Sequence, residues 1–138
     1  MAFISAIYKR TVKEGGGDFV YGEAADRPHY LTKSIVALWA KADAATPEGD
    51  EGPGGFDFLT DTNGMTIASF RAAPEKRDAT SARIAVTLGY KEKDALHKGP
   101  PVLHYDILIE DGAWKIDDIH AKGWELRKLL TDFIAVSK

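Results

Sequence analysis

The dipeptide Asp111-Gly112 constrains the fold of this chain more than any other feature of its sequence. It lies between PVLHYDILIE and AWKIDDIH, two runs in which apolar and polar residues alternate. Alternation with a period of two is typical of half-buried strands. Asp-Gly tolerates the positive φ angles that a two-residue hairpin turn requires. The sequence therefore predicts an antiparallel hairpin over residues 101–120.

The register of this hairpin follows from pairing Glu110 with Ala113 across the turn. Because side chains alternate between the faces of a sheet, each later pair is then assigned to a face. The apolar face is expected to point inward, and it pairs Ile109 with Trp114, Ile107 with Ile116, Tyr105 with Asp118 and Leu103 with His120. The solvated face pairs Leu108 with Lys115, Asp106 with Asp117 and His104 with Ile119.

Helical periodicity flanks the sheet on both sides. Apolar residues recur at a spacing of three to four, which predicts helices over residues 3–12, 31–42 and 126–134. Either Asp26 with Pro28 or Thr32 begins the second helix. Residues 83–90 alternate as a strand, with 65–73 as its partner and PEKRDATS as the connection. The acidic, Gly/Pro-rich stretch 46–55 predicts an exposed connector.

This order of elements predicts an α+β fold. N-terminal helices pack on a curved antiparallel β-sheet, and a C-terminal helix follows. With 138 residues, the chain is expected to form a single domain, 1–138. No apolar run approaches the roughly 20 residues of a membrane-spanning helix, so no membrane span is expected. A net charge of -3 with scattered basic residues argues against a nucleic-acid partner.

Five short segments carry a resemblance to a known superfamily: FISAIYKR, YLTKSIVALW, GFDF, WKIDDI and LRKLL. In this order they resemble the nuclear transport factor 2-like (cystatin-like) superfamily, whose members form a cone of bent sheet wrapped on helices. More narrowly, the chain resembles the domain of unknown function 3828 family of bacterial proteins. It departs from that family after GFDF, where Leu59, Thr60 and Met65 stand in place of acidic or amide residues.

The resemblance implies more than a cone-like fold. Many members of the narrower family are exported, which implies a periplasmic or secreted protein. A cytoplasmic location is the alternative, because MAFISAIYKR lacks the features of a signal peptide. Many cones of the superfamily form homodimers by sheet packing, for which the predicted outward residues Val102, Leu108 and Ile119 are suited.

The sharpest chemical hypothesis concerns Tyr105, Asp118 and His120, which the register places together on the inward face. A carboxylate on an apolar face has its pKa raised by desolvation, and a tyrosine on the neighbouring strand can donate a hydrogen bond to it. Ketosteroid isomerases and scytalone dehydratases, which share the superfamily's cone, use acid/base pockets of this kind. The simpler interpretation is a buried aspartate that is hydrogen-bonded for structural reasons.

The segment GFDFLTDTNG, 55–64, offers a second candidate. It is not an EF-hand loop, because the first and twelfth ligand positions would be Leu59 and Phe70. It predicts a turn over 61–64 preceded by two core-facing phenylalanines, Phe56 and Phe58. The alternative is that Asp57 or Asp61 lies at the mouth of a cavity. Candidate ligand-binding residues are Tyr8, Trp39, Asp57, Tyr105, Trp114 and Asp118.

No cofactor or metal is expected. Cysteine is absent, no phosphate-binding or nucleophile motif occurs, and the predicted register separates His104 from His120. The leading prediction is a non-enzymatic domain that binds a small apolar molecule or a protein partner at the concave sheet face. The alternatives are a cofactor-free isomerase or dehydratase that uses Asp118 and Tyr105, and an inhibitor or immunity-type protein that uses the acidic 46–55 stretch.

Overall fold

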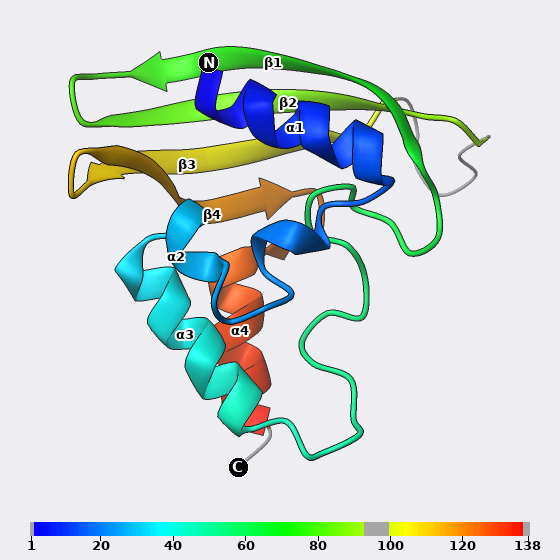
Figure 1. Cartoon of the computed structure of the whole chain (residues 1–138), viewed down its shortest axis with the longest axis vertical. Helices are drawn as coiled ribbons and strands as arrows, with labels where there is room; N and C mark the ends of the chain where they lie inside the picture. The colour runs from blue at the N-terminus through cyan, green and yellow to red at the C-terminus, as the bar shows by residue number, and fades with distance from the viewer. Residues whose placement is uncertain (1, 93–99, 137–138) are drawn as a thin grey trace.

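A computed structural model describes residues 2–92 and 100–136. It shows the predicted α+β architecture: N-terminal helices, a curved five-stranded antiparallel sheet and a C-terminal helix (Figure 1). The elements are α1 (Ala2–Glu14), the short 3-10 helix η1 (Asp18–Val20), α2 (Arg27–Tyr30), α3 (Lys33–Ala44), β1 (Ile67–Arg77), β2 (Ser81–Tyr90), β3 (Val102–Glu110), β4 (Ala113–Ala121), β5 (Trp124–Glu125) and α4 (Leu126–Val136).

The strands are ordered β1-β2-β3-β4-β5, so each strand pairs with the next one along the chain. Helix α1 lies across the sheet, whereas α3 and α4 run beside each other below β4 (Figure 1). The segment before α3 covers the edge of β4 that does not pair with β3. Leu31 forms a parallel bridge with Ile116, and the Thr32 amide donates to the Ile116 carbonyl at 2.9 Å. This contact fixes the start of α3 against the sheet.

Thr32 is the N-cap of α3. Its hydroxyl accepts a hydrogen bond from the Ile35 amide at 3.3 Å, which satisfies one of the free amides of the first turn. Pro28 instead lies in the first turn of the separate helix α2, and the Asp26 side chain makes no capping bond there. The two alternatives for the second predicted helix therefore correspond to two helices.

The connection expected at PEKRDATS is wrong in part, because β1 continues through Pro74 to Arg77. Proline lacks an amide donor, but β1 is an edge strand and has an irregularity between Pro74 and Lys76, where the missing donor is tolerated. The actual turn is short. Asp78 holds it by accepting hydrogen bonds from the backbone amides of Thr80 and Ser81.

The hairpin register is confirmed from the turn to Ile107 and is wrong beyond it. A β-bulge places the extra residue Asp117 between the pairs Ile107–Ile116 and Asp106–Asp118. Beyond the bulge Tyr105 pairs with Ile119, and His104 pairs with His120. Because one residue of slip moves every later side chain to the other face, Asp118 and His120 leave the inner face and Ile119 joins it.

The core lies between the inner face of the sheet and the helices. Inward residues alternate along β2 and β3, as the sequence predicts, and the bulge adds Ile119, which is only 1% exposed. Ile119 is therefore not an outward residue available for dimer packing. Among the described residues, no helix has the length and apolar character needed to cross a bilayer. The fully buried large side chains are Tyr8, Tyr105, Phe58, Ile4, Ile35, Leu59, Ile67, Ile84, Leu103, Ile107, Ile116 and Ile119.

Candidate functional site

Tyr105 points inward, as predicted, but its partner is Tyr8 of α1. The two hydroxyls are 2.5 Å apart, and the Tyr8 hydroxyl donates to the Leu59 carbonyl at 2.7 Å. Both side chains are completely buried, and burial is the main cause that raises the pKa of each phenol. These neutral hydroxyls form a closed chain of hydrogen bonds that ties α1 and β3 to the loop before β1. The two tyrosines therefore have a structural role.

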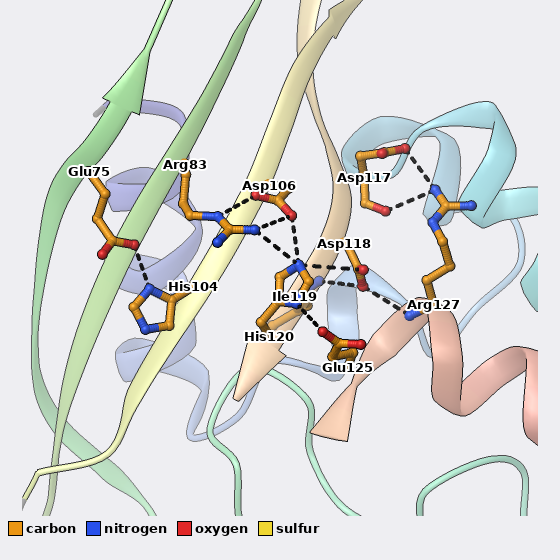
Figure 2. Close-up of polar contacts among 10 residues, drawn as sticks. All are labelled: Glu75, Arg83, His104, Asp106, Asp117, Asp118, Ile119, His120, Glu125 and Arg127. Carbon is orange, nitrogen blue, oxygen red and sulfur yellow. Dashed lines mark hydrogen bonds and ion pairs between the residues drawn. The ribbon is translucent and has the colours of Figure 1, made fainter. Parts of the chain in front are cut away.

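Asp118 and His120 lie on the outer face of the sheet, so the predicted inward trio is wrong. The cause is the bulge at Asp117 described above. Tyr105 and Asp118 therefore cannot act on one substrate within a single pocket. The outer face instead carries a connected set of polar side chains, here called the outer-face network, that runs from β2 to α4 (Figure 2). Its members are Arg83, Asp106, Asp117, Asp118, His120, Glu125 and Arg127. Glu75 of β1 and His104 of β3 form a separate pair on the same face.

His120 is the centre of this network (Figure 2). Its Nε2 lies 2.6 Å from an Asp106 carboxylate oxygen and 3.5 Å from one of Asp118, and its Nδ1 lies 2.9 Å from Glu125. Burial works to lower the pKa of His120, but the hydrogen bonds to Asp106 and Glu125 outweigh it and the pKa is raised. The imidazolium is therefore the form that the network favours.

Asp106 is held from two sides. Burial works to raise its pKa, but the hydrogen bonds from Arg83 and His120 outweigh it, so the pKa is lowered. Arg83 binds both carboxylate oxygens, at 2.7 and 3.0 Å, which is the bidentate geometry of strong guanidinium pairs. Arg83 also comes within 3.5 Å of the His120 ring.

Asp118 anchors the last helix. One of its carboxylate oxygens accepts hydrogen bonds from the backbone amides of Ile119 and Arg127, both at 2.9 Å. Arg127 is in the first turn of α4, so Asp118 provides from the sheet the acceptor that an N-cap residue normally supplies. The bulged Asp117 accepts from Thr32 and from the Arg127 side chain, which joins the starts of α3 and α4.

Asp106, Asp118 and His120 also have the spacing of a three-residue metal site, with one ligand atom each within 4.8 Å of one another. His104, on the same face as His120, is paired with Glu75 at 2.5 Å. The predicted separation of the two histidines is thus wrong. Arg83 is already paired with Asp106, and His120 is paired with Asp106 and Glu125. These ion pairs favour a structural role for the cluster, and the absence of a bound metal stays a prediction.

The segment GFDFLTDTNG forms a compact loop, but its turn lies earlier than predicted. Residues 58–61 make the turn, and Asp57 and Thr62 form a bridge across it. The Asp57 carboxylate accepts hydrogen bonds from the amides of Gly17 and Leu59 and from the Tyr21 hydroxyl, at 2.7 to 3.0 Å. Asp61 accepts from the Trp124 indole at 2.7 Å. Both carboxylates therefore hold the loop in place.

Beside this loop is a cavity of about 460 Å³, here called the loop hollow. Four separate segments line it: the end of η1, the start of α2, the last turns of α3 and the loop before β1. The lining residues are Tyr21, Gly22, Arg27, Trp39, Asp43, Thr46, Asp50, Glu51, Gly52, Pro53, Gly55, Phe56 and Phe58. The aromatic rings in this lining pack on one another, since the centres of Tyr21 and Trp39 lie 5.1 Å apart and those of Trp39 and Phe58 lie 5.5 Å apart. Trp39 and Phe58 are buried, whereas Tyr21 and Phe56 are partly exposed.

Arg27 is the one basic residue among the described residues that line the loop hollow. It is 5% exposed, lies 5.1 Å from the centre of the Trp39 ring and donates to the Tyr21 carbonyl. Its charge is paired with Asp43 at 2.6 Å. Asp50 and Glu51 are exposed on the rim, and no hydrogen bond or ion pair within the described residues engages their carboxylates. The lining thus has three acids and one base.

Two other hollows have different linings. One, of about 390 Å³, is mainly apolar and lies between α3 and the β3–β4 turn, with Leu31, Val36 and Ala37 in its lining. The other, of about 580 Å³, lies on the sheet beside the outer-face network and is lined in part by Lys76, Arg83 and Asp106. Tyr8 and Tyr105 line none of these three hollows.

Of the six predicted ligand-binding residues, only Trp39 lines the loop hollow. Tyr8 and Tyr105 are in the core, Asp118 is in the outer-face network, and Trp114 lies on the β3–β4 hairpin. Sequence reasoning missed Tyr21, Arg27 and Phe56 as lining residues. The available signal was the density of aromatic and acidic residues on either side of 46–55.

Comparison with protein-family models found no match to this chain, and comparison with curated proteins found none either.

Proposed function

We propose that this protein is a non-enzymatic binding domain whose binding site is the loop hollow. The observation that carries the proposal is the lining itself. The partly exposed rings of Tyr21 and Phe56 pack on the buried rings of Trp39 and Phe58. They lie beside the unengaged rim carboxylates of Asp50 and Glu51. A concave site that combines aromatic side chains with polar groups can bind and orient a small ligand. The volume of about 460 Å³ falls in the range for small ligands.

One feature of the inner sheet face and one of the loop hollow favour the hollow over the concave sheet face as the binding site. Tyr8 and Tyr105 fill that face and satisfy each other's hydroxyls, so a ligand there would have to displace a closed hydrogen-bond chain. The loop hollow is instead lined in part by residues 46–55, an exposed loop that is rich in glycine and proline. A binding site formed by a loop on a rigid scaffold is common in proteins.

Catalysis is less well supported. An acid/base enzyme needs a group of shifted pKa within a cavity that admits the substrate. His120 and Asp106 have shifted pKa values, but their partners Arg83, Glu125 and Asp118 already hold them in fixed ion pairs. The loop hollow contains no histidine.

The proposal is tested with benzamide, a neutral aromatic probe, by mapping amide chemical shifts in an NMR titration. We expect saturable shifts at residues of the loop hollow, including the Trp39 indole, with a dissociation constant in roughly the millimolar range for so small a ligand. Shifts confined to the groove at Val36 and Ala37, or the absence of saturable shifts, would contradict the proposal.

Blocking variants provide the matched control. Thr46→Phe places a large ring in the lining of the loop hollow, whereas Ala37→Phe does the same in the apolar groove beside α3. We expect Thr46→Phe to weaken benzamide binding at least about 5-fold, since a fully occluded site loses most of its contact area. Ala37→Phe should leave binding unchanged. Circular dichroism of both variants checks that the fold is retained.

A further inference from the structure

The charge around the loop hollow is one-sided. Residues 42–70 include no lysine, arginine or histidine, and they carry six carboxylates, although the whole chain has a net charge of only -3. Asp57 and Asp61 are used within the fold, as described above. The exposed carboxylates of Glu48, Asp50 and Glu51 fall within four consecutive residues on the rim loop.

The base that lines the hollow does not offset these acids. Arg27 is buried, and its charge is paired with Asp43. Because the negative charges of the exposed rim carboxylates add up, they produce an electrostatic field that attracts cations. An anionic or acidic ligand would be repelled there.

We infer that the group bound in the loop hollow is the side chain of an arginine or lysine from a basic segment of a protein partner. This inference rests on the proposed function, since it names the chemistry of the occupant of the same site. Arginine and lysine have an apolar stem and a charged head. The stem can pack on the partly exposed rings of Tyr21 and Phe56, and the head can pair with the carboxylates of Asp50 and Glu51 in the same lining.

The distribution of acids favours a segment of a protein over a small free cation. Asp50 and Glu51 line the hollow, but Glu48 lies on the same loop outside its lining. A single small cation in the hollow leaves Glu48 unmatched. A chain with several basic residues places one side chain in the hollow and others along the loop, and so matches all three carboxylates.

The experiment uses two synthetic peptides of one length. In the first, arginine alternates with serine, and in the second, citrulline replaces every arginine, which keeps the shape and removes the charge. Binding to the full chain is followed by NMR titration at low and at raised salt. We expect the arginine peptide to shift the resonances of the loop hollow and to bind at least about 10-fold more tightly than the citrulline peptide. Raised salt should reduce this difference, because exposed charges are screened.

Variants of the protein test whether the named carboxylates are responsible. Asp50→Asn with Glu51→Gln should weaken the arginine peptide by about 3- to 10-fold, as expected for two partly exposed ion pairs. Glu14→Gln with Asp132→Asn changes the net charge equally at positions outside the hollow, and should change the affinity less than about twofold. An equal loss in both double variants would show only a general charge effect and would overturn the inference.

The failure of the inference can be told apart from that of the proposed function. If benzamide occupies the loop hollow but the arginine and citrulline peptides bind equally, the hollow is a binding site for a different class of ligand. If free arginine amide binds as tightly as the arginine peptide, the occupant is a small cation and the protein-partner inference is wrong. If neither benzamide nor the arginine peptide shifts the hollow, both proposals fail.

Discussion

At the scale of single residues, His120 makes stability depend on pH. Its pKa is raised in the folded protein, so the folded state binds the proton more tightly than the unfolded state does. The stabilisation is fully present below the unfolded value of about 6.5 and is lost as the pH rises through the raised folded value. Asp106 has a lowered pKa, so its stabilisation is present above its unfolded pKa of about 4 and is lost as the pH falls below that value.

The prediction concerns the stability difference between the wild type and His120→Gln, measured by urea unfolding from about pH 5.5 to 8.5. This difference should be largest at the acid end and should decrease towards the alkaline end. His29→Gln, which removes a histidine outside the outer-face network, should give no such trend. A difference that grows with pH would contradict the structure of the network.

The two buried tyrosines should respond unequally to loss of their hydroxyls. Tyr8→Phe leaves both the Leu59 carbonyl and the Tyr105 hydroxyl without a partner, so we expect a cost of about 1–3 kcal/mol. In Tyr105→Phe the bond from Tyr8 to Leu59 survives, so the cost should be smaller, about 0.5–1.5 kcal/mol. Chemical denaturation of both variants measures the two costs, and a larger cost for Tyr105→Phe would contradict the hydrogen-bond chain from Tyr105 through Tyr8 to Leu59.

Asp118 should behave as a capping residue. Asp118→Ala removes the acceptor for the Arg127 amide, and should destabilise the protein by about 0.5–2 kcal/mol. Asp118→Asn retains an oxygen acceptor, so we expect it to be milder. Because the role is structural, neither variant should alter the affinity for benzamide. A loss of benzamide binding without a loss of stability would contradict this structural role and would support Asp118 as a ligand-binding residue.

At the scale of elements, a glycine turn brings the end of α1 against the loop before β1. A Cβ at Gly17 would lie 2.4 Å from the Leu59 Cβ, and Leu59 is fully buried. Gly17→Ala should therefore destabilise the protein by about 1–3 kcal/mol through overpacking. Gly52→Ala is the matched control, because nothing lies within 4 Å of its Cβ and its φ is not positive. Thermal unfolding of both variants tests the contact.

The hairpin shows how far alternation along a strand predicts a structure. Asp111-Gly112 predicted the turn and the first pairs, because the turn itself specifies them. A bulge has no dipeptide signature of this kind, and a prediction that assumes strict alternation of side chains does not detect the extra residue. The signal was the spacing of Ile116 and Ile119, two β-branched residues three apart, with two aspartates between them. Both isoleucines can be buried only if one aspartate is extra.

The short helices show a related limit. Thr32 and the pair Asp26 with Pro28 are both plausible start signals, and a single predicted helix forced a choice between them. The chain uses a break at Leu31 to cover the edge of β4, a long-range contact that local propensity does not encode. The closing helix, in contrast, has a strong apolar stripe and was predicted correctly, with Leu126 and Leu130 buried.

At the scale of the whole molecule, the order of helices, sheet and helix followed from periodicity, but the candidate site did not. The loop hollow is assembled from four segments between residues 21 and 58, and of its lining only Trp39 was predicted as a ligand-binding residue. The lining depends on the path of the 46–55 loop after α3, which composition does not determine. The acidic character of that stretch, however, was visible in the sequence.

The proposal that the loop hollow is the binding site is tested most directly by a crystal structure of the protein soaked with benzamide. The account predicts density for the ring beside Trp39, beneath the loop that carries Asp50 and Glu51. Density in the groove beside Val36, or next to Tyr105 under the sheet, with the loop hollow empty, would contradict it.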